Sequence, residues 1–515
     1  MRDRNETESG PLHWADRVAQ DVVGLERPTV ISTGISPSGE IHIGNMREVL
    51  TGDAVFRAIR DRGEPVRFNY VADNFDPLRR VYPFLDGERY EGLVGRPLSE
   101  IPCPCGGHAS YADHFLEPFL EALERLHVEV EVERADQMYK SGRMIPYIVL
   151  ALERRDAIAQ ILRDETGKEV TADWSPFNPL CVACGRMTAA KVTGFSAEQR
   201  SVDYACACGE RGSVPMAGGG KLVWRIDWPA RWMVLGVTVE PFGKDHATRG
   251  GSYDTGARIV SEVFGGQPPY PIPYEWIRLK GRGDMASSRG NVLTIGEVLE
   301  VAPPEALRYL VMRERPQRTI GFDPGLPLLQ LVDQLDDAAA RGRDERAVEL
   351  SRAGTFQAVG VSYKHLVVVT QAARFDEQRT LDILRRTGFA ELPREAVLGR
   401  IAYAKRWLQA FAPEDLRFEV QPQLPAAAAT LSDDQRRFLG LLSERLEREM
   451  DAQAIHSLIH ELAKQFEAAA PAELFRAVYL ALLGKPRGPR AGAFIEVLGI
   501  DFAARRFSEA SRAAS

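Results

Sequence analysis

Residues 29–50 read TVISTGISPSGEIHIGNMREVL and combine an apolar run, a turn rich in glycine and serine, and the start of an amphipathic pattern. The apolar run at 29–31 predicts a strand, and the spacing from Met46 to about Arg60 predicts a helix. A strand, a turn and a helix in this order offer free backbone N–H groups to a phosphate. An ordinary connection without a ligand fits the same pattern, because single glycine-rich turns match often by chance.

The side chains of this turn strengthen the binding interpretation. His42 and Asn45 fall at or near the predicted start of the helix, so that they face whatever the turn holds. Gly44 has no Cβ, which leaves room for a flat ring to approach the backbone. The turn is therefore the first candidate site in the chain.

The string GISPSGEIHIGN, residues 34–45, resembles the HIGH motif of class I aminoacyl-tRNA synthetases in the form of the class I lysyl-tRNA synthetases. The resemblance covers nearly the whole chain, from His13 to a basic loop near residue 490, because further motifs follow in the family's order. It implies an α/β fold: a Rossmann-like parallel-sheet catalytic core with zinc-binding insertions and an all-α C-terminal anticodon-binding bundle.

Composition sets wider limits on the class of protein. A chain of 515 residues is too long for one core, and its 44% hydrophobic and 27% charged residues are ordinary for a globular protein. A net charge of −7 means that any RNA must bind a local basic patch. The sequence shows no apolar run long enough for a membrane span and no secretory signal. We therefore expect a cytoplasmic protein.

The chain divides into segments by these patterns. The predicted segments are the first half of the catalytic core at 1–90, a zinc-binding insertion at 91–127, a helical connective part at 128–173, a zinc-ribbon-like insertion at 174–220, the second half of the core at 221–302, and a helical tRNA- and anticodon-binding domain at 303–515.

The six cysteines occur in tight local pairs, which favours metal binding over a disulfide framework. One group has the spacing C-x-C-x2-H-x5-H and offers the four ligands that tetrahedral zinc needs: Cys103, Cys105, His108 and His114. Two further pairs flank a stretch suited to an antiparallel ribbon: Cys181, Cys184, Cys206 and Cys208. Neither group leaves an open position, so both predict structural zinc. The suspected family commonly has Asp at position 103, which leaves open which cysteine of the first pair binds.

The second predicted strand covers residues 66–70, and acidic residues follow it. Ligands of open α/β sheets bind at the carboxyl ends of the strands, and a buried ammonium needs an anionic partner. Asp73 and Asp76 are therefore candidates to bind the ε-ammonium of a lysine. They could equally cap the next helix or pair with Arg79 and Arg80.

Two motifs mark the second half of the core. The segment WRIDWPARW, residues 224–232, is either a packed aromatic layer or the wall of a pocket for an aliphatic stem, and it is characteristic of the suspected family. Residues 234–239 predict a core strand. The string PFGKDH that follows, residues 241–246, resembles the Gly-x-Asp-His element that class I synthetases use beside the adenosine.

Residues 280–291 read KGRGDMASSRGN and resemble the KMSKS loop, which clamps the triphosphate of ATP. Asp284 stands where the first lysine belongs, and Ala286 replaces a serine. A carboxylate beside a triphosphate is repulsive by about 1 kcal/mol or more. Three cations of the same stretch are placed to offset this repulsion: Lys280, Arg282 and Arg289.

From Pro304 the sequence is dominated by helical patterns. A loop with three cations and no acid, KPRGPR at 485–490, is either a contact for RNA phosphate or a solvated connection. His456 and His460 lack the glutamate of a metalloprotease motif, and we interpret them as surface or interhelix residues.

The resemblance implies the two-step reaction of a lysine–tRNA ligase in translation. Lysine attacks the α-phosphate of ATP to give lysyl-adenylate and pyrophosphate, and the lysyl group then passes to the 2′-hydroxyl of the terminal adenosine of tRNA-Lys. The substrate carboxylate is the nucleophile, so catalysis is positioning and charge stabilisation. Mg²⁺ accompanies ATP, structural Zn²⁺ fills one or two sites, and we expect a monomer.

The resemblance also implies roles for particular residues. Contacts to the reacting phosphates are expected from His42, Asn45, Ser287, Ser288 and Arg289. Further ATP contacts are expected from Pro37, Ser38, Gly39, Gly44, Asp245, His246 and Met285. The lysine pocket is expected to contain Gly34, Ser36, Asp73, Trp228 and Tyr274.

Asp284 leaves two other functions open. One is a paralogue that adenylates lysine for an acceptor outside translation. The other is a regulator that binds lysine or tRNA and does not charge it. A charging assay with tRNA-Lys separates all three.

Overall fold

The computed structural model describes residues 12–25, 27–280, 292–466 and 470–513. The chain forms two compact units. The first unit comprises residues 1–299, 304–322 and 344–356. The second comprises residues 300–303, 323–343 and 357–515.

Five parallel strands form the central sheet of the first unit, in the order β10-β9-β1-β2-β3. Their bounds are β1 Thr29–Ile35, β2 Val66–Ala72, β3 Glu131–Arg134, β9 Val239–Gly243 and β10 Tyr270–Tyr274. The chain builds outward from β1 to β3 on one side and from β9 to β10 on the other. The topological switch point, where ligands of such sheets bind, therefore lies between β1 and β9. The predicted Rossmann-like core is confirmed.

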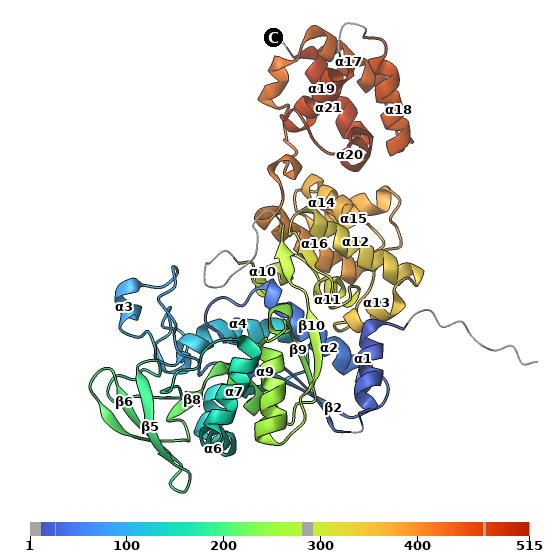
Figure 1. Cartoon of the computed structure of the whole chain (residues 1–515). Helices are drawn as coiled ribbons and strands as arrows, with labels where there is room; N and C mark the ends of the chain where they lie inside the picture. The colour runs from blue at the N-terminus through green and yellow to red at the C-terminus, as the bar shows by residue number, and fades with distance from the viewer. Residues whose placement is uncertain (1–11, 26, 281–291, 467–469, 514–515) are drawn as a thin grey trace, which may run out of the picture. The chain divides into compact units, whose positions relative to one another are not determined.

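Helices pack around this sheet (Figure 1). In the first unit they are α1 Trp14–Val23, α2 Ile43–Arg60, α3 Gly87–Glu91, α4 Tyr111–Arg125, α5 Ala135–Lys140, α6 Ile145–Glu153, α7 Arg155–Thr166, α8 Trp224–Leu235, α9 Ser252–Ile259, α10 Ile295–Leu299, α11 Pro304–Met312 and α13 Glu345–Ser351. The first of the helical patterns predicted from Pro304 onward is α11, which belongs to the first unit.

Helix α2 follows the predicted binding turn and packs against β1, β2 and β9. Its Arg47 is fully buried, and Nη2 donates to the carbonyls of Arg315, Pro316 and Arg318 at 3.0, 3.1 and 3.3 Å. A buried cation without partners would be strongly destabilising. These bonds therefore fix α2, and with it the turn at its start, relative to the segment that follows α11.

The second insertion contains two small antiparallel sheets. One pairs β4 Phe177–Pro179 with β8 Gly220–Leu222, and the other has the order β5-β6-β7, with β5 Ala190–Ser196, β6 Ser201–Cys206 and β7 Arg211–Pro215. The predicted antiparallel ribbon between the cysteine pairs is thus confirmed, with a third strand (Figure 1).

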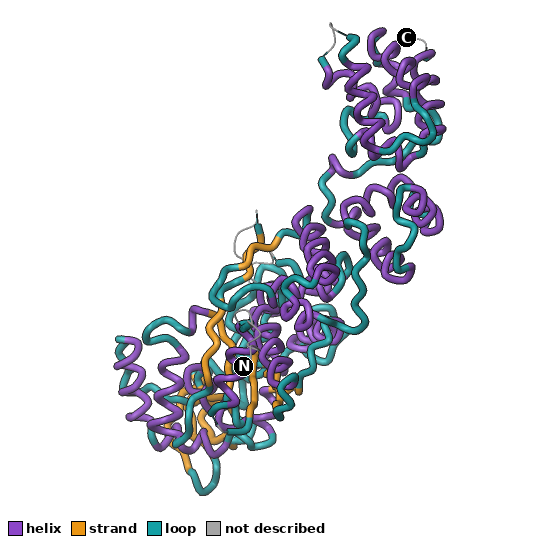
Figure 2. The backbone as a smooth tube through the Cα atoms, turned by 90° about the vertical axis from the view of Figure 1, so that its right-hand side faces the viewer, coloured by secondary structure: helices purple, strands orange, loops and turns teal. Residues whose placement is uncertain are grey.

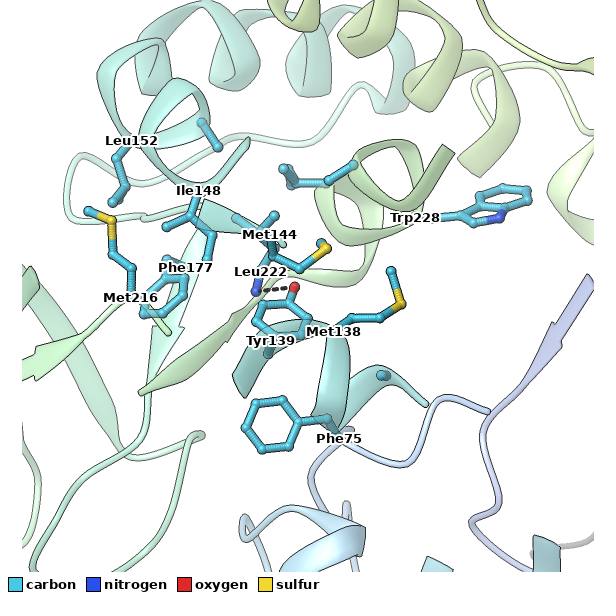
Figure 3. Close-up of a cluster of buried hydrophobic side chains, with 14 of the residues drawn as sticks. Phe75, Met138, Tyr139, Met144, Ile148, Leu152, Phe177, Met216, Leu222 and Trp228 are labelled. Carbon is cyan, nitrogen blue, oxygen red and sulfur yellow. Dashed lines mark hydrogen bonds between the residues drawn. The ribbon is translucent and has the colours of Figure 1, made fainter. Parts of the chain in front are cut away.

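One hydrophobic core joins the connective helices, this insertion and α8 (Figure 3). At its centre Tyr139 of α5 accepts a hydrogen bond from the backbone N–H of Leu222 at 3.0 Å and donates to Asp227 at 2.5 Å. Phe75 packs against the ring of Tyr139, with 5.5 Å between ring centroids. Tyr139 therefore connects the insertion, through Leu222, with Asp227, which lies at the floor of the candidate site.

The strand predicted at 234–239 is wrong at its start: α8 extends to Leu235, Gly236 terminates it with φ of +66°, and β9 begins only at Val239. The sequence also predicts strands at 128–132 and 274–279. The first is β3, which begins only at Glu131. The second is two strands, β10 and β11 Ile277–Leu279, and β11 pairs with β12 Ile320–Phe322. Short apolar runs do not distinguish a helix from a strand.

The described residues of the second unit form helices and loops (Figure 2). The helices are α12 Leu326–Arg341, α14 Tyr363–Ala372, α15 Glu377–Arg386, α16 Arg394–Ala410, α17 Asp433–Arg445, α18 Ala452–Ala463, α19 Pro471–Leu483, α20 Ala491–Leu498 and α21 Ile500–Arg512. The prediction of an all-α C-terminal part is confirmed. Among the described residues no helix is long and apolar enough to cross a membrane.

Candidate active site

The turn between β1 and α2 is ordered by its own side chains. His42 is the N-cap of α2: its Nδ1 accepts from the backbone N–H of Gly44 at 3.0 Å, and Oδ1 of Asn45 accepts from the N–H of His42 at 3.1 Å. Burial lowers the pKa of His42 to about 4, so the ring is neutral at pH 7. Because Nδ1 is an acceptor, the proton lies on Nε2, which makes that atom a hydrogen-bond donor.

Two pockets adjoin at this turn. We call the first, of about 80 Å³, the deep pocket; its walls include Gly34, Ser36, Asp73, Trp228, Arg231 and Glu240. We call the second, of about 490 Å³, the outer pocket; its walls include His42, Gly44, Asn45, Asp245, Tyr274 and Trp276. Glu48 and His246 line both. The two pockets lie at the carboxyl ends of β1 and β9, where the topology places a ligand.

A buried ion network lies at the floor of the deep pocket. Asp73 forms two ion pairs: Oδ1 lies 2.7 Å from Lys221 Nζ, and Oδ2 lies 2.7 Å from Arg231 Nη2. Asp227 pairs with the same two cations, and Asp76 pairs with Lys221. Burial opposes ionisation of Asp73, but the charges of Arg231 and Lys221 outweigh it and lower its pKa to about 2. Asp73 therefore lies at the predicted place but already carries two cationic partners.

Two further carboxyl groups face the pockets without a cation. Glu48 Oε1 accepts from the N–H of Gly34 at 2.8 Å, and Oε2 accepts from the hydroxyl of Tyr274 at 2.7 Å. Burial raises the pKa of Glu48 to about 7 against these hydrogen bonds, and the charge of Asp245 adds to the rise.

Glu240 of β9 is the more deeply buried of the two, with 4% of the residue exposed. Its Oε1 accepts from Trp228 Nε1 at 2.7 Å, whereas Oε2 has no hydrogen-bond partner among the described residues. Burial raises the pKa of Glu240 well above its usual range, and nearby Glu48 adds to this. A buried carboxyl group with one unused oxygen is a ready partner for a cationic ligand.

Aromatic rings of α8 form one wall of the deep pocket. Trp224 stacks on Trp228 at 5.4 Å between centroids, and Trp228 also contacts Trp232 at 4.8 Å. His246 lies 5.5 Å from the Trp228 ring. The segment at 224–232 therefore forms both a packed aromatic layer and a wall of the deep pocket, and the two interpretations of its sequence are compatible.

The structure brings most of the predicted site residues together. Of the expected lysine contacts, four line the deep pocket and Tyr274 lines the outer one: Gly34, Ser36, Asp73, Trp228 and Tyr274. The outer pocket also collects His42, Gly44, Asn45, Asp245 and His246. Pro37, Ser38 and Gly39 lie in the turn itself, where the carbonyl of Ser38 accepts from the hydroxyl of Tyr111 at 2.8 Å.

The KMSKS-like residues Met285, Ser287, Ser288 and Arg289, together with Asp284 and Ala286, lie outside the described residues. The segment that follows them is described. The N–H of Ile43 donates to the carbonyl of Leu293 at 3.0 Å, and His42 forms a β-bridge with Thr294. The chain therefore leaves the predicted clamp loop directly beside the turn.

Sequence reasoning missed four charged residues of the deep pocket: Glu48, Lys221, Arg231 and Glu240. Glu48 follows Asn45 by three positions on α2, so helical spacing places both on one face. Glu240 is an acid inside a buried strand, which is itself a signal of function. The other two are cations whose partners lie far away in sequence.

Both predicted metal groups assemble. In the first, the Sγ atoms of Cys103 and Cys105 and the Nδ1 atoms of His108 and His114 are separated pairwise by 3.3–3.6 Å. Tetrahedral zinc with the usual bond lengths separates its ligand atoms by about 3.3–3.8 Å. Both cysteines of the first pair are thus placed to bind.

The second group is built from two cysteine pairs of the second insertion. Its Sγ atoms lie 3.7 Å apart between Cys181 and Cys208 and 3.7 Å apart between Cys184 and Cys206. All four sulfur atoms lie within 4.8 Å of one another. Four thiolates at these separations fit a closed tetrahedral metal site.

Taken together, the parallel sheet, the histidine-capped turn and the pocket at the switch point are those of a nucleotide-binding enzyme of the class I synthetase type. A family model described as "tRNA synthetases class I (K)" matches residues 12–357, and a second, described as "Anticodon binding domain", matches residues 406–511. The chain therefore belongs to the family of class I lysine tRNA synthetases.

Relatives agree over the full length. The chain is 50% identical to a lysine–tRNA ligase of Methanosarcina barkeri, covering 97% of this chain and 98% of the relative. It is 47% identical to a lysine–tRNA ligase of Archaeoglobus fulgidus, covering 97% and 100%. A solved glutamate–tRNA synthetase from Elizabethkingia anophelis is 14% identical, with a TM-score of 0.43, and covers 95% of this chain and 100% of that one.

Proposed function

We propose that the chain is a lysine–tRNA ligase that activates L-lysine with ATP and transfers it to tRNA-Lys in translation. One observation carries the proposal: a deep pocket lined by the carboxyl groups of Glu48 and Glu240 shares walls with an outer pocket that is lined by the neutral His42. A ligand with its ammonium in the deep pocket and a triphosphate in the outer pocket would both lie beside the turn between β1 and α2. The full-length relatives named lysine–tRNA ligase support the same substrate.

Lysine fits the deep pocket with its ε-ammonium inward. Glu240 offers an unpartnered oxygen and Glu48 a second carboxyl group, while the indole of Trp228 packs the aliphatic stem. Asp73 forms ion pairs with Lys221 and Arg231, and this network serves as a fixed floor. The α-carboxylate of the lysine then points to the outer pocket.

ATP fits the outer pocket. His42 Nε2–H and the amide of Asn45 would donate to the phosphates, and Asp245 and His246 would lie near the ribose or base. Ser287, Ser288 and Arg289, which lie outside the described residues, would hold the pyrophosphate. An oxygen of the lysine carboxylate forms a bond to the α-phosphorus as the bond to pyrophosphate breaks. These residues position the reactants and stabilise the charge, with Mg²⁺ brought by ATP.

The decisive experiment measures ATP–pyrophosphate exchange with each of the twenty amino acids, followed by charging of tRNA-Lys. We expect exchange with lysine above all others, and charging. Exchange without charging would indicate a different acceptor for the lysyl group. The absence of both would overturn the proposal.

The pH dependence of lysine binding is a first prediction. Lysine binds as a cation and favours ionised Glu48, whose pKa in the free protein is about 7. Below that pH, binding must displace a proton from Glu48, so this group alone is expected to lower the KM for lysine by about tenfold from pH 6 to pH 8. His42 adds nothing in this range because its pKa is about 4. Steady-state exchange kinetics across this range measure the effect.

The control for this prediction is Glu48→Gln, which removes this titrating group and should make the fall in KM between pH 6 and 8 shallower than in the unaltered protein. Burial also raises the pKa of Glu240, which is present in both proteins, so the difference between the two profiles measures the contribution of Glu48. A KM for lysine that does not change with pH in the unaltered protein would show that no carboxyl group ionises on binding.

We further propose that both Cys/His groups hold structural zinc. The separations of their ligand atoms support this, and each group closes an insertion too small for a large core of its own. The second prediction is a zinc content of about two ions per chain. Cys103→Ser and Cys181→Ser should each lower it to about one and lower the unfolding temperature.

Elemental analysis and thermal unfolding test this prediction without reference to activity. His456→Ala is the matched control, because this histidine lies on α18 outside both groups. Its zinc content should equal that of the unaltered chain. A chain purified without added chelator that holds no zinc would contradict both sites.

A further inference from the structure

The second unit contains a groove at the end of α14 that no part of the mechanism uses. We call it the α14 groove; its walls include Gln371, Arg374, Phe375, Gln409, Arg417 and Glu419, and its volume is about 490 Å³. The groove lies between the end of α14 and the segment that follows α16. Its walls are fixed by Gln371, whose amide donates to the carbonyl of Leu416 and accepts from the N–H of Phe418.

Two neighbouring residues of this groove have an unusual backbone. Arg374 and Phe375 have φ angles of +56° and +64°, the left-handed region that glycine normally occupies. Each such residue costs about 1–3 kcal/mol and persists where the surrounding structure holds it, often at binding sites. Here the N–H groups of both are tied to the last turn of α14, at 2.9 Å each, to Gln371 and Thr370.

This backbone presents an aromatic ring to solvent. Phe375 is 44% exposed, although it adjoins a helix whose other apolar side chains are mostly buried. Glycine at this position would relieve the backbone strain, so the strain and the exposure are both consequences of keeping a ring here. An exposed aromatic face on a rigid support suits stacking by a flat ligand.

Cations surround the ring. Arg374 and Arg417 are exposed on the walls of the groove, and Lys485 Nζ donates to the carbonyl of Arg417 at 2.8 Å. The basic loop at 485–490 therefore begins beside the groove. Among the described residues, none of these three cations forms an ion pair with a carboxylate. These three cations are therefore available for the phosphate contacts that RNA binding requires.

We propose that the α14 groove binds an unpaired base of the tRNA, which stacks on Phe375 while Arg374, Arg417 and Lys485 contact its phosphates. This inference rests on the proposed function for the identity of the RNA. The amide of Gln409 and the carboxylate of Glu419 lie on the walls, where the edge of a base would meet them. The α14 side of the groove lies outside residues 406–511, which match the anticodon-binding description.

The ring is tested with Phe375→Ala, Phe375→Tyr and Phe375→Gly. Stacking is worth about 1–3 kcal/mol per base, so Phe375→Ala should raise the KM for a tRNA-Lys transcript about 5- to 150-fold. The KM values for lysine and ATP, measured with saturating tRNA, should stay unchanged, because Phe375 lines neither the deep pocket nor the outer pocket. Phe375→Tyr keeps the ring and should retain the KM within about twofold.

Phe375→Gly separates binding from folding. It relieves the left-handed strain, so its unfolding temperature should exceed that of Phe375→Ala, yet its KM for tRNA should be raised equally. A normal KM in both Phe375→Ala and Phe375→Gly would overturn the groove proposal. Charging by the unaltered chain would still support the proposed function, so the two failures are distinguishable.

The cations are tested by salt dependence. In fluorescence titrations with an anticodon stem-loop RNA, Arg374→Ala and Arg417→Ala should each lower the slope of log K against log salt by about one. Arg448→Ala is the control: this exposed arginine of the same unit is already paired with Asp501 at 2.9 Å and should leave the slope unchanged. RNA binding that needs the cations but tolerates Phe375→Ala would point to contact with the phosphates alone and contradict stacking.

Discussion

Replacing His42 by alanine is expected to lower the rate of lysine-dependent ATP–pyrophosphate exchange by about 100- to 1,000-fold, the usual loss when one preorganised donor to a transition state is removed. The ring is neutral, its Nδ1 is committed to the N–H of Gly44, and its Nε2–H lies on the wall of the outer pocket. The donor is therefore held in place before ATP binds. The expected loss is in kcat, because the developing charge exists only in the transition state.

His42 is also a helix cap, so the experiment must separate the two roles. Losing an N-cap costs about 1 kcal/mol of stability, and asparagine is among the best caps. His42→Asn should therefore unfold at a higher temperature than His42→Ala but lose exchange to the same degree, since its short side chain does not reach as far as Nε2. Near-normal exchange in either variant would remove His42 from the mechanism.

The parts of the site that the sequence could predict are local in the chain. The turn at 34–45 places its backbone and His42 within a dozen residues, and each half of a metal group is a short pair. Local spacing determines geometry directly in such cases, which is why both metal groups and the histidine cap form as expected. The core sheet follows for a related reason, since consecutive apolar strands and helices have few alternative arrangements.

The rest could not be predicted because it depends on contacts distant in sequence. Lys221 meets Asp73 across 148 positions, and nothing near either residue identifies the other. Asp73 was expected to be free for a ligand or paired with Arg79 or Arg80, whereas Lys221 and Arg231 occupy both of its oxygens. The tryptophan-rich segment is a helix because tertiary packing decides the state of short apolar runs.

Contacts between residues that are distant in sequence also determine which carboxyl group is left to bind the substrate. At the floor of the deep pocket, Asp73, Asp76 and Asp227 pair with Lys221 and Arg231, and Asp76 also pairs with the exposed Arg79 at 3.9 Å. The carboxylates of the floor are therefore already engaged by cations of the protein. The carboxyl group of Glu240 is positioned to bind a cationic ligand, because one of its oxygens has no hydrogen-bond partner among the described residues.

Glu240→Gln is therefore expected to raise the KM for lysine by about 150- to 5,000-fold, because removing one partner of a buried charge pair costs about 3–5 kcal/mol. Glutamine has the same shape and can still accept from Trp228 Nε1, so the wall of the pocket should stay in place. The KM for ATP should not change, since Glu240 does not line the outer pocket. Pyrophosphate exchange at varied lysine and ATP measures both constants.

Specificity gives the stronger test of the same residue. Norleucine has the lysine stem without the ammonium, so the unaltered enzyme should discriminate against it through Glu240, and Glu240→Gln should lose most of that discrimination. A variant that folds poorly would lose activity on both amino acids and leave their ratio unchanged. If the ratio of kcat/KM for lysine over norleucine is unchanged in Glu240→Gln, the ε-ammonium lies elsewhere. Glu48, the other carboxyl group of the deep pocket without a cation, would then be its partner.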